Sequence, residues 1–214
     1  MSATMHRIVG FLLLVSAGWA HGSPIVADGR EWLQPADFLG LSWNGVNDAC
    51  NPAVDGRCTG EIGGFDLQGW TWASVEDMQA LFNFYIGSDE LGPELVSVFS
   101  EVGTDWAGQI FADGFRETAT FANGALGIYG WTRTLVPGTV NPAYTAGAAW
   151  LENTLQNQAQ TGGVSENQVD FVLFGGPIGV WFYREPESVP APSTLVLLAL
   201  GLWLMGLSRR RCSS

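Results

Sequence analysis

The sequence contains no lysine, and its only two histidines, His6 and His21, lie within the first 22 of its 214 residues. Without histidine, the rest of the chain cannot build a Ser-His-Asp or Cys-His nucleophile, nor a zinc or iron site with histidine ligands. Without lysine, it has no Schiff-base lysine, Ser-Lys dyad or phosphate-binding P-loop lysine. The chemistry left open is that of carboxylates or of a hard cation bound by oxygen atoms.

Positive charge is scarce as well. All nine basic residues are arginines, and only five of them lie between residues 23 and 188, where all 21 acidic residues are found. That segment carries a formal charge of −16. Such a charge argues against nucleic acid as a partner and against adsorption to anionic lipid, because both need a basic surface. It favours solubility and attracts divalent cations.

Residues 1–22 are predicted to be a signal peptide. Arg7 precedes an apolar run over 8–20, and Ala20 and Gly22 occupy the −3 and −1 positions if cleavage falls before Ser23. The run is short for a membrane span. Cleavage after Ala20 and a retained N-terminal anchor are the alternatives. We expect export through the Sec translocon.

The last 26 residues, 189–214, have three parts in a fixed order. A stiff proline motif comes first, an apolar helix of 194–208 follows, and an arginine cluster closes it. The motif is Val189, Pro190, Ala191 and Pro192, and the cluster is Arg209, Arg210 and Arg211. At about 1.5 Å per residue the helix is short for a permanent span. The arginines should stay in the cytoplasm and stop transfer.

The run VPAPSTLVLLALGLWLMGLSRRR resembles the C-terminal sorting signal of PEP-CTERM proteins. The resemblance implies recognition by an exosortase, a membrane protease of Gram-negative-type bacteria. Pro190-Ala191-Pro192 departs from the usual Pro-Glu-Pro of this family by lacking the acidic residue. A tail anchor or a stop-transfer helix is the alternative interpretation. The resemblance implies inner-membrane anchoring before processing, and then a cell-surface or extracellular location.

These features divide the chain into a signal peptide at 1–22, an extracytoplasmic globular domain at 23–188 and a sorting signal with a transmembrane helix at 189–214. Cys50 and Cys58 are the only cysteines of the domain. We predict a disulfide between them because the domain is exported to an oxidising compartment. Closing such a loop stabilises a fold by about 2–3 kcal/mol. A reactive thiol pair is the alternative, but no activating base is visible.

Local patterns predict helices early in the domain and strands late. Ser74 as N-cap, acidic residues in the first turn and apolar residues at helical spacing predict a helix over 74–85. A second helix is predicted within 90–102, with Leu95, Val98 and Phe99 on its apolar side. Segments 65–72, 118–133 and 168–184 are predicted to be strands, with a turn at 175–177 and a loop over 44–64. Segment 141–161 is ambiguous between helix and loop.

The fold predicted from this order is α+β, with one or two helices of the N-terminal half packed on a mainly antiparallel sheet, plus the C-terminal hydrophobic helix. Segment 28–81 contains EWL at 31–33, GLSW at 40–43, GWTWAS at 69–74 and EDMQAL at 76–81. It resembles an uncharacterised domain that is common among PEP-CTERM proteins. Its Gly-Trp turn into a helix is similar to that of C-type-lectin-like domains, at the level of fold only.

Two kinds of candidate binding residue stand out. Trp70 and Trp72 alternate, so one of them should face outward from a strand and offer a sugar-stacking surface. The alternative is that the tryptophans fill the core. Asp48 and Asp55, in a loop rich in Asn and Asp, are weak calcium candidates. Their spacing does not match an EF-hand, and Asx turns in a solvated loop are the favoured interpretation. No catalytic residue, metal site or cofactor is predicted.

The leading functional prediction is a surface or extracellular-matrix protein that an exosortase sorts and that has no catalytic activity. Its expected partners are exosortase, the Sec translocon, the inner membrane and exopolysaccharide. A binding module that depends on carbohydrate or calcium is the first alternative. A polysaccharide hydrolase that uses carboxylates is the second, and it requires two carboxyl groups at glycosidase separation in a cleft.

Overall fold

The computed structural model describes residues 23–50, 55–94, 96–135, 143–164, 170–171 and 176–186. The predicted signal peptide, the sorting signal and the hydrophobic helix at 194–208 lie outside these residues. The described part consists mainly of antiparallel sheets with a few helices, so the predicted α+β class is confirmed. Within that part, no helix is both long and apolar enough to span a membrane.

The first sheet joins the two ends of the domain. Its four strands run in the order β1-β2-β14-β5. They are β1 (Ile25–Ala27), β2 (Arg30–Trp32), β14 (Phe182–Arg184) and β5 (Thr71–Trp72). A tight turn with positive φ at Asp28 and Gly29 connects β1 to β2. Because Tyr183 pairs with Trp32 of β2 on one side and with Thr71 of β5 on the other, the last described strand lies in the interior of the sheet and not at its edge.

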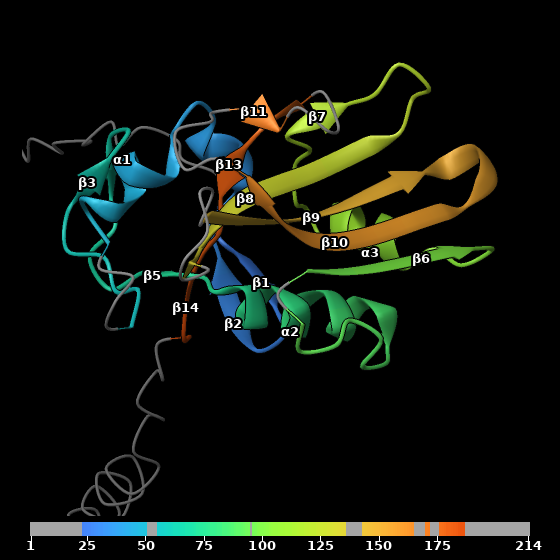
Figure 1. Ribbon diagram of the computed structural model, residues 1–214, viewed down its shortest axis with the longest axis horizontal. Coiled ribbons are helices and arrows are strands. Elements are labelled where there is room, and N and C mark those ends of the chain that lie inside the picture. Colours follow the sequence, from blue (N-terminus) through green and yellow to red (C-terminus); the bar gives the residue numbers. More distant parts are fainter. Residues whose placement is uncertain are drawn as a thin grey trace, which may run out of the picture.

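The second sheet is larger and runs in the order β13-β8-β9-β10-β6, with β7 paired to β8 (Figure 1). Its strands are β6 (Ser97–Val102), β7 (Ala119–Thr120), β8 (Leu126–Leu135), β9 (Ala143–Leu151), β10 (Gln156–Val164) and β13 (Gly179–Val180). The 3-10 turn η2 (Glu152–Thr154) connects β9 to β10. Only the β13–β8 pair of this sheet is parallel among the described strands.

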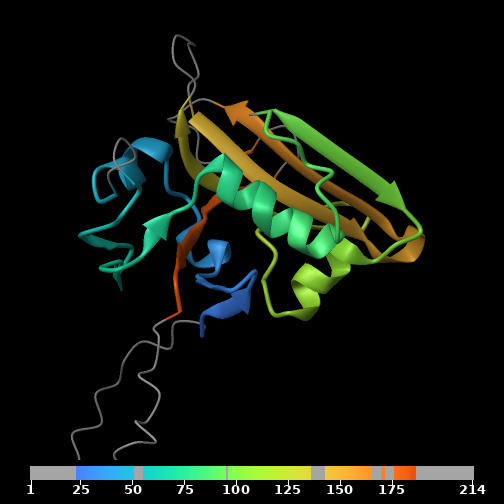
Figure 2. The same cartoon turned by 90° about the horizontal axis from the view of Figure 1, so that it is seen from below.

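Helices cover one face of the large sheet. The predicted helix over 74–85 is confirmed as α2 (Val75–Ile86), and a second helix, α3 (Trp106–Ala112), lies beside it (Figure 2). Residues of both helices share one buried cluster with Ile128, Ala146, Ala148 and Ala159 of the sheet. The small alanine side chains let the helices approach the strands closely. The opposite face of the sheet carries neither helix.

Smaller elements lie beside the two sheets (Figure 1). A 3-10 turn, a short helix and two two-stranded pairs make up this group. They are η1 (Pro35–Phe38), α1 (Trp43–Asn47), the β3 (Glu61–Ile62) and β4 (Phe65–Asp66) pair, and the β11 (Asp170–Phe171) and β12 (Gly176–Pro177) pair. Around them a second buried cluster is rich in aromatic side chains, including Trp43, Trp72 and Trp131.

Two of the element predictions are wrong. The helix predicted within 90–102 is instead strand β6, which pairs with β10 from far along the chain, and the helix lies at 106–112. The described part of segment 141–161, from residue 143 on, is not a helix or a loop but belongs to the β9–β10 hairpin. Its alanines have high helix propensity, yet here they serve as small side chains under the packed helices.

Three further segments differ from prediction. The loop expected over 44–64 contains α1 and β3. The strand expected over 65–72 is divided into β4 and β5 by a turn that includes Gly69, whose φ is +85°. Gly176 and Pro177, expected to form a turn, pair as strand β12 with β11. Strand structure in 118–133 and in the described part of 168–184 is as predicted.

Candidate functional site

The tryptophans of the domain belong to its core. Seven of the eight are buried, namely Trp32, Trp43, Trp70, Trp72, Trp106, Trp131 and Trp181. The prediction that Trp70 or Trp72 faces outward is wrong, because their exposed fractions are 6% and 0%. Strand β5 begins at Thr71, so its alternation does not extend to Trp70, and the Arg184 guanidinium covers that ring at 4.6 Å. These side chains offer no open stacking surface.

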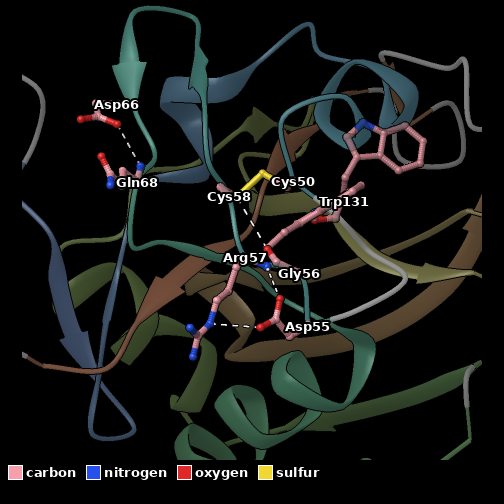
Figure 3. Close-up of a disulfide and its surroundings, with 9 residues drawn as sticks. Cys50, Asp55, Gly56, Arg57, Cys58, Asp66, Gln68 and Trp131 are labelled. Atoms are coloured by element: carbon pink, nitrogen blue, oxygen red, sulfur yellow. Dashed lines mark hydrogen bonds and ion pairs between the residues drawn. A yellow bond between two sulfur atoms is a disulfide. The ribbon is translucent and has the colours of Figure 1, made fainter.

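Cys50 and Cys58 are joined by a disulfide with an S–S distance of 2.08 Å, and both are buried (Figure 3). Backbone hydrogen bonds tie the disulfide loop to its surroundings. Cys58 N donates to Trp70 O at 2.9 Å, and Thr59 N donates to Ala49 O at 3.1 Å. The disulfide therefore fixes the connection between α1 and the turn that precedes β5.

The two calcium candidates have separate surroundings. Asp48 is exposed at the end of α1. Asp55 is engaged by Arg57, whose Nε lies 3.1 Å from Asp55 Oδ2 and whose backbone N donates to Oδ1 (Figure 3). Across the described ranges, no three or more Asp, Glu, His or Cys residues are grouped closely enough to hold a metal ion. The local structure at Asp55 is an Asx turn with its own counter-ion.

A charged cleft of about 550 Å³ lies where the disulfide loop meets the end of strand β14. Its charged residues have both signs and lie in pairs or near counter-ions. They are Asp55, Arg57, Arg184 and Glu185. Arg184 Nε lies 2.6 Å from Glu31 Oε2, and burial raises the pKa of the nearby Tyr183, with Asp77 contributing further. This arrangement stabilises the exit of the chain from the first sheet.

A second hollow of about 590 Å³ lies on the face of the large sheet that carries no helix, and we call it the sheet groove. Its floor and walls come from β6, β9, β10 and the segment that connects β7 to β8. No charged side chain is among its twelve lining residues. The sequence prediction missed this groove because it did not recognise the strands that form it. The alternation of Gln156, Gln158 and Gln160 was the available signal.

Many acidic side chains of the described residues serve local structure. Asp77 Oδ2 accepts a hydrogen bond from Ser74 N at 2.8 Å, and Asp77 Oδ1 lies 3.0 Å from Arg30 Nη1. Asp37 is paired with Arg116. These carboxylates therefore form a helix cap and ion pairs that stabilise the fold.

The C-terminal segment is similar to a known protein-sorting motif. The model for the PEP-CTERM protein-sorting motif matches residues 188–211. The chain carries a PEP-CTERM sorting signal. The match contains the predicted proline motif, from Val189 to Pro192, and the arginine cluster, from Arg209 to Arg211. The predicted resemblance is confirmed, and the PEP-CTERM signal identifies an exported protein that undergoes membrane-associated sorting and processing by an exosortase.

No curated protein and no solved structure matches the chain. The PEP-CTERM match covers none of the residues described in the fold. The resemblances of segment 28–81 to an uncharacterised PEP-CTERM-associated domain and to C-type-lectin-like domains therefore stay predictions.

Proposed function

We propose that this chain is a non-catalytic protein of the cell surface or extracellular matrix, exported through the Sec translocon and released from the inner membrane by exosortase. The observation that carries the proposal is the PEP-CTERM match at 188–211. The boundaries are signal peptide 1–22, domain 23–188 and sorting signal 189–214. The apolar segment 194–208 holds the protein in the inner membrane until the cut.

The fold supports a cut near residues 189–192. Strand β14 ends at Arg184, just before the matched motif, and it is paired on both sides by β2 and β5. Arg184 is further held by Glu31 and by the Trp70 ring. A cut after these residues removes no strand of the described sheets. The domain therefore stays folded when it leaves the membrane.

The absence of catalytic activity is supported by composition and by local contacts. Residues 23–188 contain neither lysine nor histidine. Asp37, Asp55 and Asp77 are each paired with an arginine. The matching assay incubates the purified protein with a polysaccharide panel and measures reducing ends. Release of new reducing ends that stops when a single carboxylate is replaced would contradict the proposal.

The processing step is tested by expressing the chain with and without exosortase and following it in membrane and surface fractions. We expect the protein to stay in the membrane fraction without the enzyme. Ala191→Glu, which restores the acidic residue usual in the family, should increase the released fraction. Asp89→Glu, a change in the domain, is the matched control and should not alter it. Equal release with and without exosortase would contradict the proposal.

Glycan binding is a second candidate function, and the sheet groove is the observation that favours it. Its lining combines amide side chains with an aromatic ring and contains no charge. Dependence on calcium has no comparable support, because Asp55 is held by Arg57. A melting experiment with added calcium tests that dependence.

A further inference from the structure

The sheet groove is built on one face of three adjacent strands. Gln158 of β10 pairs with Ala149 of β9 and with Ser100 of β6, so these three residues share a face. Gln156 pairs with Leu151 and with Val102 in the same way. Their neighbours in sequence, such as Ala148 and Ala159, are buried under the helices on the other side. The groove residues therefore face away from the helices.

Small residues make the groove hollow, and the aromatic residue Phe121 borders it. Ala149 and Ala125 line it with single methyl groups. Gly127 lets Phe121 lie close to the sheet, since a Cβ at Gly127 would be 2.8 Å from Phe121 Cε2. The Phe121 ring meets Tyr129 edge to face, at a centroid distance of 6.3 Å. This contact orients a partly exposed ring at the border of the groove.

The polar groups of the groove are neutral and have two-sided hydrogen-bonding capacity. Gln156 and Gln158 carry amides that both donate and accept, and Ser100 carries a hydroxyl that does the same. Asn123 is exposed, and its Oδ1 accepts from Ala125 N at 3.1 Å, which fixes the side chain at the rim. Asn157 is different, because its amide is used by Ala107, Thr104 and Leu155 and serves the fold.

Charge decides the class of ligand. The domain carries a formal charge of −16, yet no lining residue of the groove is acidic or basic. An anionic chain would meet a repulsive field with no arginine to neutralise it, and a cation would find no carboxylate in the groove. A second copy of this domain would bring its own −16 against the surface. A neutral ligand rich in hydroxyl groups satisfies amides and a ring without opposing this field.

We propose that the sheet groove binds a segment of neutral polysaccharide. Gln158 and Gln156 exchange hydrogen bonds with sugar hydroxyl groups, and the Phe121 ring contacts an apolar sugar face. The volume of about 590 Å³ lies within the range of ligand sites, about 300–1,000 Å³. This inference deepens the second candidate function, and it places the exported domain in contact with neutral glycan at the cell surface.

The test titrates the purified full chain, in a detergent without sugar groups, with neutral hexasaccharides of glucose in β-1,4, β-1,3 and α-1,4 linkage. Hexagalacturonate is the anionic counterpart. Calorimetry should detect binding of at least one neutral hexasaccharide below about 10 mM and weaker or no binding of hexagalacturonate. Gln158→Ala should weaken the binding about 3- to 10-fold, as expected for the loss of one or two hydrogen bonds.

Gln160→Ala is the matched control. Gln160 lies on the same strand and face, two residues beyond Gln158, and does not line the groove. The affinity of the Gln160→Ala variant for the neutral hexasaccharide should stay within about twofold of that of the parent chain, since no ligand hydrogen bond is lost. An equal loss of hexasaccharide affinity in Gln158→Ala and Gln160→Ala would overturn the proposal. So would the absence of binding by all three neutral hexasaccharides, tighter binding of hexagalacturonate, or a dimer in sedimentation that Gln158→Ala abolishes.

Release by exosortase is measured on the same Gln158→Ala variant and should be unchanged. In the parent chain, normal release without glycan binding would refute this inference and leave the sorting function intact. Glycan binding without release would leave the inference intact and refute the sorting proposal.

Discussion

Gly56 lies in the disulfide loop at a position that accepts no side chain. Its φ is +74°, and a Cβ there would be 2.6 Å from Trp72 O and would also meet the Arg133 side chain. We expect Gly56→Ala to lower the free energy of unfolding by about 1–2 kcal/mol for the positive φ and by a further ~1–3 kcal/mol for the clash. Urea denaturation of the Gly56→Ala variant measures the sum of these two contributions.

Gly69→Ala separates the two contributions. Gly69 has a φ of +85° and no atom within 4 Å of a built Cβ, so only the conformational part applies. Gly69→Ala should therefore lower the free energy of unfolding by about 1–2 kcal/mol. Equal losses in the two variants would show that the contact of Gly56 with Trp72 is unimportant.

Tyr129 is a buried tyrosine whose titration should limit stability in alkali. Burial raises the pKa of Tyr129 above the ordinary value of about 10. Below pH ~10 both states keep the proton, so stability is unaffected. As the pH rises above ~10, the unfolded chain releases the proton while the folded chain retains it, and the free energy of unfolding falls by up to ~1.4 kcal/mol per pH unit for this group.

Tyr129→Phe should make this alkaline loss shallower without removing it. Burial also raises the pKa values of Tyr85 and Tyr183, so these two residues retain their share of the effect. The measurement is urea unfolding between about pH 8 and 11, comparing slopes instead of absolute values. Identical slopes for the variant and the parent would contradict the assignment to Tyr129.

At the scale of elements, helix α2 depends on its first turn. Asp77 N donates to Ser74 Oγ at 3.2 Å, and Ser74 N donates to Asp77 Oδ2 at 2.8 Å, which forms a capping box. Ser74→Ala should lower the free energy of unfolding by about 1 kcal/mol. Ser74→Asp retains an acceptor and should lose less. Thermal melts that rank the two variants in the opposite order would count against the cap.

Helix α2 was predictable because its signals are local. Ser74, the acidic first turn and the apolar spacing all lie within the helix or next to it. Strand β6 was not predictable in this way, because its pairing partner β10 lies far along the chain. Val98 and Val102 are 58% and 66% exposed, so hydrophobicity gave a misleading indication of a buried helix face. Edge strands of this kind are fixed by tertiary pairing and not by local pattern.

Local sequence patterns did not predict the β9–β10 hairpin either. The sheet groove, which this hairpin helps to form, was therefore not predicted. The alanines of the hairpin favour helix in isolation, and only the packing of α2 and α3 makes small side chains necessary there. Burial of Trp70 likewise depends on Arg184, which is distant in sequence. The C-terminal sorting signal was predictable because its three parts lie next to one another along the chain, in the matched segment 188–211.

At the scale of the whole molecule, the dominant feature is the formal charge of −16 on residues 23–188. Arg30, Arg57, Arg116 and Arg184 each pair with an acidic residue, which leaves a large excess of negative charge. Sodium chloride screens this repulsion, so the melting temperature should rise from low salt to about 0.15 M. Surface ion pairs weaken at the same time, but each contributes only ~0–1 kcal/mol.

Calcium chloride at matched ionic strength is the control for this salt effect. Screening predicts nearly the same rise in melting temperature, and a much larger rise would reveal specific calcium binding. A melting temperature that falls with sodium chloride would show that local ion pairs outweigh the net repulsion.

Release by exosortase depends on residues 188–211, which lie outside the described fold. Intact-mass spectrometry of the protein recovered from the cell surface tests it most directly. We expect a single species that lacks residues 1–22 and the segment beyond the proline motif, including Arg209, Arg210 and Arg211. Surface protein that still carries residues 209–214 would contradict this expectation.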